Sequence, residues 1–397
     1  MNRELRLIDP DLGREETEAV SALLSDREAL PYVAFVPRPN GPIQRLAEAF
    51  AAFLREGIGP DHPLVASFLR ERGVSEVPLF LGGFASATGA IFAGLRSIGV
   101  AGGEVITTSL NYVGVPNAVI MAQAAPRFVD VDGRTFCMDP ALIEAAVTPR
   151  TKAVIITHLN RFVDIAPVAE LFRRKGYEFP LVQDASLAVG STLRGLRPGV
   201  VNVGPGGFTV FSLATSKVIT GLGGAILSTN DGWLLSRALT IAYQGMSFRE
   251  IGVLDAFGAN IKMNDINAAI ALARLGKREK IFARRRELKA LYDASLAPLA
   301  ESGKAVLQDA GEEAVVTHYA VACDDRGELA RRLYARHSIH LGMWHVHHMQ
   351  EIYEAVRTSL PESERLDGRF TLLPFHTGLS DDEVRLICRA LIEELGA

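Results

Sequence analysis

The segment Phe208–Ala225 holds the chain's most chemically suggestive group of side chains. Lys217 follows an apolar run and three hydroxyl residues, of which Ser212 is the first, and it precedes a glycine-rich turn at residues 221–224. Hydroxyl groups can hold a phosphate, glycines let the backbone approach a flat ring, and a lysine placed among them can become a nucleophilic amine. The alternative is a surface lysine beside a β-turn, because glycine-rich turns are common.

A second segment, Pro180–Gly190, is an apolar run that ends in Asp184 and small residues. Ligands of open α/β sheets bind beyond the carboxyl ends of the strands, so Asp184 is expected to point into the site. A carboxylate there can pair with a protonated ring nitrogen. The alternative is that Asp184 caps a following helix.

The third segment, Gly82–Ala90, leads into a helical pattern that reaches Ile98. Free amides at a helix start suit a phosphate dianion, and the hydroxyls of Ser86 and Thr88 would assist them. A simple helix cap explains the segment equally well. The pattern is neither a Walker A loop nor a dinucleotide fingerprint.

The composition is that of an ordinary soluble enzyme. Of 397 residues, 48% are hydrophobic and 22% are charged, and 42 basic against 46 acidic residues give a formal net charge of −4. This balance argues against nucleic-acid or membrane binding by charge. The three cysteines are widely separated, and neither a signal peptide nor a membrane-spanning run is visible, so we expect a cytoplasmic protein.

The elements that must position these groups alternate between strands and helices, which predicts a parallel sheet covered by helices. The expected helices include 140–146 and 166–175. Short, almost wholly apolar runs are typical of strands buried on both faces, and the expected strands are 104–108, 127–131, 153–157, 180–183, 208–212 and 225–228.

Three regions follow from this pattern. Residues 1–60 are predicted to form an N-terminal extension containing an amphipathic helix at 43–55, and residues 61–263 a large α/β domain. In residues 264–397 a long connecting helix, 264–296, leads to a smaller C-terminal α+β domain. Arg284, Arg285 and Arg286 are expected on the solvated part of that helix.

Together the segments resemble the DegT/DnrJ/EryC1/StrS family of pyridoxal 5′-phosphate (PLP) aminotransferases, from about Leu64 to the C-terminus. Ser86-Ala87-Thr88 is similar to the family's Ser-Gly-Thr phosphate loop, and Asp184-Ala185 to the start of its Asp-Ala-Ala-Gln element. The other matching stretches, which follow in the family's order, are Glu104-Val-Ile, Tyr112-Val-Gly-Val-Pro-Asn117-Ala, Phe128-Val-Asp-Val-Asp132, Thr148 to Leu159, Ser212 to Lys217 and Asn260 to Ala269.

The resemblance implies an aspartate-aminotransferase-like fold of type I and a role for individual residues. Lys217 would bind the cofactor covalently and move a proton between donor and cofactor, while Asp184 would keep the ring nitrogen protonated. Tyr112 would stack on the ring. Asn260 would reach the phosphate of a neighbouring subunit, which implies a homodimer with shared active sites, and the phosphate of the chain's own cofactor would be held by Ser86, Thr88, Gly89 and Ser212.

Four departures from the family pattern concern the substrate more than the cofactor. Ala87 replaces a glycine, which reduces backbone freedom, and Leu187 stands where the family has Gln or His. Lys262 replaces an arginine and loses a bidentate grip on an anion. Asn160-Arg161 replaces Tyr-Gly, in a loop expected near the substrate mouth.

Several histidines invite other interpretations. His345 and His347 would share one face of a strand, but no nearby Cys or carboxylate pair completes a metal site, so we predict no metal. His347 and His348 fall where the family has a histidine-containing loop near the active-site entrance, and a substrate-side role is assigned to them and to His158 and Asn160. For His158 a structural role is the alternative.

The function implied is transfer of an amino group from an amino-acid donor, glutamate or glutamine, to a ketone. By resemblance the acceptor is a keto sugar, often nucleotide-linked, or a keto cyclitol, in antibiotic or polysaccharide synthesis. Sugar dehydration is disfavoured because that branch of the family has histidine in place of Lys217. Another PLP reaction, of aldol or oxidative type, stays open, as does a non-catalytic regulatory protein on the same fold.

Overall fold

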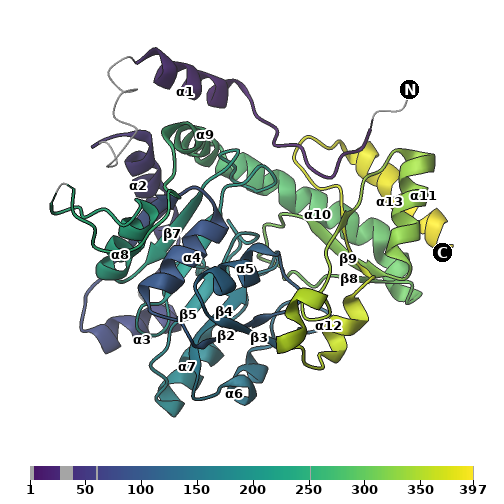
Figure 1. Ribbon diagram of the computed structural model, residues 1–397. Helices are drawn as coiled ribbons and strands as arrows, with labels where there is room; N and C mark the ends of the chain where they lie inside the picture. The colour runs from purple at the N-terminus through teal and green to yellow at the C-terminus, as the bar shows by residue number, and fades with distance from the viewer. Residues whose placement is uncertain (1–3, 27–38, 60, 251, 397) are drawn as a thin grey trace.

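The computed structural model describes residues 4–26, 39–59, 61–250 and 252–396, and its largest feature is a seven-stranded sheet (Figure 1). The strand order is β1-β7-β6-β5-β4-β2-β3. Strands β3, β2, β4, β5 and β6 run parallel, and β7 is antiparallel to both of its neighbours. The strands are β1 (Phe80–Phe84), β2 (Glu104–Thr108), β3 (Ala125–Val129), β4 (Thr151–Thr157), β5 (Leu181–Asp184), β6 (Phe208–Ser212) and β7 (Ala225–Thr229).

Helices cover both faces of this sheet, as is typical of a sheet whose strands are mostly parallel. The strand residues alternate between the two layers: Val105 and Ile155 belong to one apolar cluster, and Ile106 and Ile156 to the other. One face is covered by α4 (Ala87–Ser97), α5 (Gly114–Met121) and α8 (Gly232–Ala242). The other is covered by α2 (Pro42–Arg55), α3 (Pro63–Arg72), α7 (Ala166–Lys175) and α9 (Asp265–Gly276).

The connecting segment consists of two helices where the sequence predicted one. Helix α9 ends at Gly276, and α10 (Arg278–Glu301) begins two residues later. Glycine is unfavourable inside a helix, and Lys277 between the helices has a non-helical ψ of 9°. Figure 1 shows α10 running from the large sheet to the smaller C-terminal sheet.

That smaller sheet is antiparallel, with the order β10-β11-β9-β8. Its strands are β8 (Ala305–Leu307), β9 (Tyr319–Cys323), β10 (Gly342–Met343) and β11 (Phe370–Leu373), and its helices are α11 (Arg326–His337) and α13 (Asp381–Leu395). The remaining short helices are η2 (Pro140–Leu142), α6 (Ile143–Ala146), η3 (Glu351–Val356) and α12 (Pro361–Leu366). The fold class predicted from the sequence, α/β with a smaller α+β region, is confirmed.

The described residues among the first 60 contact both regions. The apolar face of α2 inserts Leu46, Phe50 and Phe53 into the core beneath the large sheet. Helix α1 (Arg14–Ser25) packs against α9, and Leu5 pairs with Ile339 of the C-terminal region. The predicted boundary of an extension at residue 60 therefore stays a prediction, but α2 is part of the main core.

Candidate active site

The three segments singled out from the sequence meet at one edge of the large sheet. Asp184 is the last residue of β5, and Ser212 is the last residue of β6. Beyond β6 the amide of Leu213 donates to the carbonyl of Gly224 at 2.9 Å, and the amide of Gly224 donates to the carbonyl of Ala85 at 3.0 Å. The carboxyl ends of the parallel strands lie at this edge, where ligands of such sheets bind.

Lys217 lies in the loop after β6 and is largely shielded from solvent. Burial lowers the pKa of its amine to about 8, and the nearby charge of Asp184 opposes that shift. The loop is fixed by α9, because the side-chain amide of Asn267 donates to the carbonyl of Gly221 at 2.7 Å. An amine with this pKa is partly neutral near pH 8, as a nucleophile or proton carrier must be.

Asp184 is buried, and its Oδ1 accepts a hydrogen bond from the amide of Ser186 at 3.0 Å. Burial raises the pKa of its carboxyl, while the bonds from Ser186 and the charge of Lys217 act in the opposite sense. No helix follows β5 directly, so the helix-cap alternative is wrong. A buried carboxylate of this kind suits a cationic partner such as a protonated ring nitrogen.

The phosphate loop begins helix α4. The hydroxyl of Ser86 caps the helix by accepting from the amide of Gly89 at 3.1 Å. Ala87 is the first helical residue and is not among the residues with positive φ, so the alanine that replaces the family's glycine has no conformational cost here. A Cβ at Gly114 would come within 2.4 Å of the Thr88 hydroxyl oxygen, which explains the glycine at the start of α5.

Tyr112 and Asn260 are on the exposed rim. Tyr112 is 58% exposed, and its ring centroid lies 6.3 Å from that of Trp344. Asn260 accepts a hydrogen bond from the amine of Lys262 at 2.6 Å, and the same amine lies 5.7 Å from the ring centroid of Tyr243. The predicted contacts of Tyr112 and Asn260 with cofactor therefore stay predictions.

These groups fit PLP. A shielded amine of lowered pKa, a buried carboxylate and a hydroxyl-bearing helix start supply the partners that its aldehyde, ring nitrogen and phosphate need. Leu187, by contrast, packs in the apolar core and offers the ring no polar contact.

His158 and Asn160 are inside the protein, not at a substrate mouth. The ring of His158 contacts the side chain of Gln183 at 3.1 Å and accepts from the amide of Val163 at 3.1 Å. Burial lowers its pKa to about 4. Asn160 is completely buried and its amide is fully engaged in hydrogen bonds. The predicted substrate contacts of His158 and Asn160 stay predictions, and the burial and hydrogen bonds of the His158 ring agree with the structural alternative.

His347 and His348 fasten the C-terminal region to the loop that carries Tyr112. His347 Nε2 lies 3.0 Å from the carbonyl of Asn111, and His348 Nδ1 lies 2.7 Å from the hydroxyl of Ser109. Both side chains are buried. The predicted strand containing His345 and His347 is wrong, because β10 ends at Met343. Among the described residues, no group of three or more His, Cys, Asp or Glu is arranged to hold a metal ion.

Two residues near the site were not predicted. Arg285 was expected on a solvated helix face, but it is 3% exposed and its guanidinium donates to the carbonyls of Val316 and Thr317. His318, directly before β9, is also buried. No local motif marks either residue, since Arg285 bonds to carbonyls 31 and 32 residues further along the chain, and His318 is bonded by Asn160, 158 residues before it.

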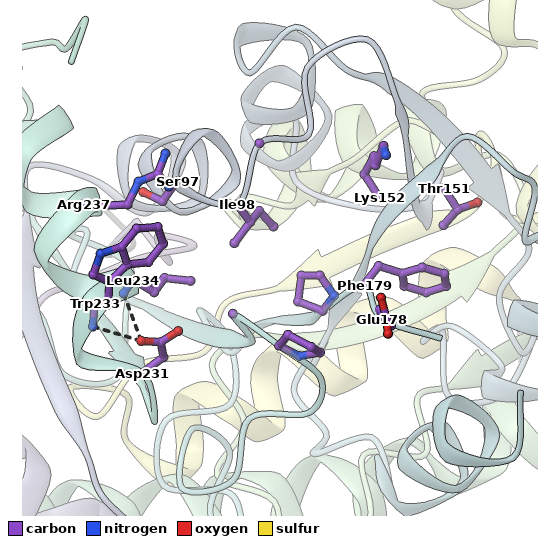
Figure 2. A pocket seen from close by; sticks show the side chains of 14 residues that line it. Ser97, Ile98, Thr151, Lys152, Glu178, Phe179, Asp231, Trp233, Leu234 and Arg237 are labelled. Carbon is purple, nitrogen blue, oxygen red and sulfur yellow. Dashed lines mark hydrogen bonds between the residues drawn. The ribbon is translucent and has the colours of Figure 1, made fainter. Parts of the chain in front are cut away.

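The cavity in Figure 2, of about 570 Å³, lies at the opposite edge of the sheet. It is lined by Thr151 at the start of β4, Pro180 just before β5 and Gly206 just before β6. In Figure 2 Asp231 caps the first turn of α8, and Arg237 lies 4.5 Å from the ring centroid of Trp233. This cavity is separate from the Lys217 site.

The sequence model of the DegT/DnrJ/EryC1/StrS aminotransferase family matches residues 81–392. GDP-perosamine synthase of Escherichia coli O157:H7 is 29% identical over 313 residues, which are 78% of this chain and 84% of that protein. The enzyme of the same name from Caulobacter vibrioides is 36% identical over 216 residues, 54% of this chain and 57% of the relative. L-glutamine:2-deoxy-scyllo-inosose aminotransferase of Micromonospora echinospora is 34% identical over 227 residues, 54% and 52% of the two chains. The matched regions thus span just over half the length of two of these relatives.

Solved structures have the same fold. The aminotransferase TlmJ of Streptoalloteichus hindustanus superposes with a TM-score of 0.80, covers 99% of both chains and is 26% identical. NtdA of Bacillus subtilis, solved with bound cofactor PMP, superposes with a TM-score of 0.82 at 22% identity and covers 99% of this chain and 86% of that one. None of the helices in the described residues is long and apolar enough to cross a membrane.

Proposed function

The chain belongs to the DegT/DnrJ/EryC1/StrS aminotransferase family, as the sequence resemblance predicted, and we propose that it uses PLP to move an amino group from an amino acid to a keto sugar or keto cyclitol. The observation that carries this proposal is the placement of Lys217 and the buried Asp184 at the same carboxyl edge of the sheet, close enough for their charges to influence each other's pKa. The predicted cofactor agrees with the family and with a structural neighbour that binds PMP.

When bound, PLP supplies a ring that takes up electrons from Cα of the amino donor. The carboxylate of Asp184 would hold a proton at the ring nitrogen, and that positive charge would in turn favour the ionised form of Asp184. The Lys217 amine, with its pKa of about 8, would take the proton from Cα of the donor and deliver it to C4′ of the cofactor. In the second half of the reaction the same amine would take a proton from C4′ and deliver it to the carbon derived from the ketone acceptor, so one residue would serve both halves.

The acceptor class rests on the relatives. Two of them are named as GDP-perosamine synthases and one as an L-glutamine:2-deoxy-scyllo-inosose aminotransferase. A nucleotide-linked keto sugar and a keto cyclitol are therefore the acceptors to test first, with glutamate and glutamine as donors. We also propose a role in antibiotic or polysaccharide biosynthesis, as the family resemblance implies.

We also propose a homodimer whose active sites are shared between subunits. The loop between α8 and α9, which projects beside α8 in Figure 1, exposes large apolar side chains: Leu254 is 64% and Phe257 is 92% exposed. Exposed apolar surface of this kind marks an interface. Asn260, assigned by resemblance to the neighbour's phosphate, ends the same loop. We further propose a cytoplasmic location, because the three cysteines are buried and unpaired.

The test is the visible spectrum of purified protein incubated with PLP, before and after glutamate or glutamine is added. We expect wild type to acquire the absorbance of a lysine-linked cofactor and to lose it on addition of donor, and Lys217→Ala never to acquire it. Lys152→Ala, in the distant cavity, is the matched control and should behave as wild type. A wild type that binds PLP but does not respond to donors would refute aminotransfer, and one that binds no PLP would refute the proposal as a whole.

A further inference from the structure

The segment just before helix α9 carries two polar side chains, Asn260 and Lys262, on a backbone that is fixed from both sides. Asn260 forms an antiparallel bridge with Tyr243, which directly follows α8, and Lys262 forms one with the last residue of β1. Between them, the carbonyl of Ile261 accepts a hydrogen bond from the amide of Ala85 at 2.7 Å. The segment is therefore extended, and it is joined to the residue that precedes the phosphate loop.

The direction of each side chain follows from this backbone. Ile261 packs on the phosphate loop, since a Cβ at Gly89 would lie 3.4 Å from the Cβ of Ile261. Successive side chains of an extended segment point to opposite sides. Asn260 and Lys262 therefore point away from the phosphate loop of their own chain, and a phosphate bound by them belongs to another molecule.

The two outward side chains are bonded to each other. Lys262 Nζ lies 2.6 Å from Oδ1 of Asn260 and 5.7 Å from the ring centroid of Tyr243, which is 3% exposed. An ammonium group can donate hydrogen bonds but cannot accept them, so the atom of Asn260 that faces it must be the oxygen. The Nδ2 group then faces away from Lys262, and it makes no hydrogen bond within the described part of the chain.

This contact decides what Asn260 offers to a ligand. The two ends of an asparagine amide are nearly equal in shape, so an exposed asparagine can present either its oxygen or its NH₂ group. With the oxygen held by Lys262, Asn260 can present only the donor. A hydrogen-bond donor next to a positive charge suits a phosphate group and repels no part of it.

Building on the proposed cofactor and homodimer, we propose that Lys262 is a positioning residue. It holds the Asn260 amide so that Nδ2 donates to the phosphate of the cofactor bound by the neighbouring subunit. The lysine that departs from the family pattern thus acts through Asn260 rather than by gripping the anion itself. No covalent bond is made or broken in this step.

The experiment compares PLP with pyridoxal, which has the same ring and aldehyde but no phosphate. Each compound is titrated into cofactor-free wild type, Asn260→Ala, Lys262→Met and the double variant, and the absorbance of lysine-linked cofactor gives the dissociation constant. We expect Asn260→Ala to weaken PLP binding about tenfold, as loss of a hydrogen bond to a charged group does. Lys262→Met should weaken it about threefold, because the amide must then be ordered on binding.

The double variant decides between an indirect and a direct role of Lys262. If Lys262 acts through Asn260, the double variant binds PLP as Asn260→Ala does, and pyridoxal binds equally to all four proteins. The proposal is overturned if Lys262→Met has wild-type affinity for PLP, or if it weakens binding as much in the Asn260→Ala background as in wild type. Equal losses for PLP and pyridoxal would mean that the substitutions disturb the fold, and would overturn it too.

Lys289→Met is the matched control. Lys289 also donates to a side chain near it in the sequence, Asp293 at 2.7 Å, but it lies on α10. Its replacement should leave the affinity for PLP and for pyridoxal unchanged.

Mixed dimers test whose phosphate is bound. A dimer of one Lys262→Met subunit and one Lys217→Ala subunit should contain one site of wild-type PLP affinity, because that site combines Lys217 of the first subunit with Lys262 of the second. A single site with the weaker affinity of the Lys262→Met homodimer overturns the proposal. These titrations do not involve amino transfer, so a wild type that binds PLP and responds to glutamate retains the proposed function whatever they show.

Discussion

The floor of the candidate active site, formed by Asp184, Lys217 and the segment before His318, differs in construction from its rim. The rim is formed by Tyr112 and by the loop that carries Phe257 and Asn260. On the floor, Asp184 is buried and the neighbouring His318 segment is held by at least six hydrogen bonds from Asn160, Arg285 and Thr317. On the rim, Tyr112 is 58% and Phe257 is 92% exposed. The chain therefore shields from solvent the residues that are proposed to move protons, and it leaves apolar surface uncovered where a second copy is proposed to bind. A substitution on the floor should therefore alter chemistry without altering assembly.

The largest effect is expected on the floor, from Asp184→Asn. The amide keeps the shape of the carboxylate but cannot hold a proton on the ring nitrogen by its charge, so the cofactor loses much of its capacity to accept electrons. We expect kcat for amino transfer to fall by about 1,000-fold, within the range of general acid–base effects, while the protein remains dimeric. Donor-dependent bleaching followed by stopped flow measures the first half-reaction.

Asp164→Asn is the control for that experiment. Asp164 lies in the segment between β4 and α7, and its carboxylate accepts a hydrogen bond from the amide of Ala166 at 2.9 Å. Equal losses in both variants would mean that Asp184 acts through stability rather than through the ring nitrogen.

The difference between floor and rim also explains what the sequence could predict. Strands β2 and β6 and helix α7 have their predicted bounds, because the apolar pattern of each begins and ends clearly. The placement of Asp184 and Ser212 at the carboxyl edge of the sheet could be predicted because each is the last residue of a strand, and Lys217 follows in the loop after β6.

Other features could not be predicted from the local sequence. Strand β1 was missed because its sequence, Phe80-Leu-Gly-Gly-Phe84, is low in β propensity; a Cβ at Gly82 would come within 2.8 Å of Leu235. The burial of Arg285 and His318 depends on hydrogen bonds to residues outside their own helix or strand. When those partners are not known, a charged residue in a helix is predicted to be exposed to solvent. The rim is proposed to contact a second chain, which a single sequence does not display.

The second prediction tests the rim with Phe257→Glu. A charge at the centre of a desolvated apolar contact costs several kcal/mol when it has no partner. We expect the mass in light scattering to fall from dimer to monomer and amino transfer to fall about tenfold or more, because Asn260 no longer reaches a neighbouring phosphate. The pKa of Lys217 in cofactor-free protein should stay at about 8.

Trp233→Glu is the matched control, since Trp233 is 63% exposed but lines the distant cavity of Figure 2. It should remain dimeric and active. A Phe257→Glu variant that stays dimeric would remove the loop between α8 and α9 from the interface, and one that is monomeric but fully active would show that the rim does not share active sites.

The smallest expected effect is a change in the free energy of unfolding with pH. It arises from the titration of Lys217 on the floor of the site. The pKa of Lys217 is about 8 in the folded protein and 10.5 in its unperturbed state. Between these values the unfolded chain binds more protons than the folded one, so the free energy of unfolding rises with pH across the window. Because Lys217 is not wholly removed from solvent, the gain is discounted to about 1–2 kcal/mol.

The measurement is urea unfolding of cofactor-free wild type and Lys217→Met at pH 7 and pH 10. Wild type should gain about 1–2 kcal/mol relative to Lys217→Met over that interval, since methionine cannot titrate. Tyr292 and Tyr319 have pKa values raised above the ordinary range, and their contribution cancels because both proteins contain them. If the free energies of unfolding of the two proteins change with pH in parallel, Lys217 titrates as an ordinary surface lysine. Lys217 would then not be desolvated, and the contrast between a desolvated floor and an open rim would be wrong.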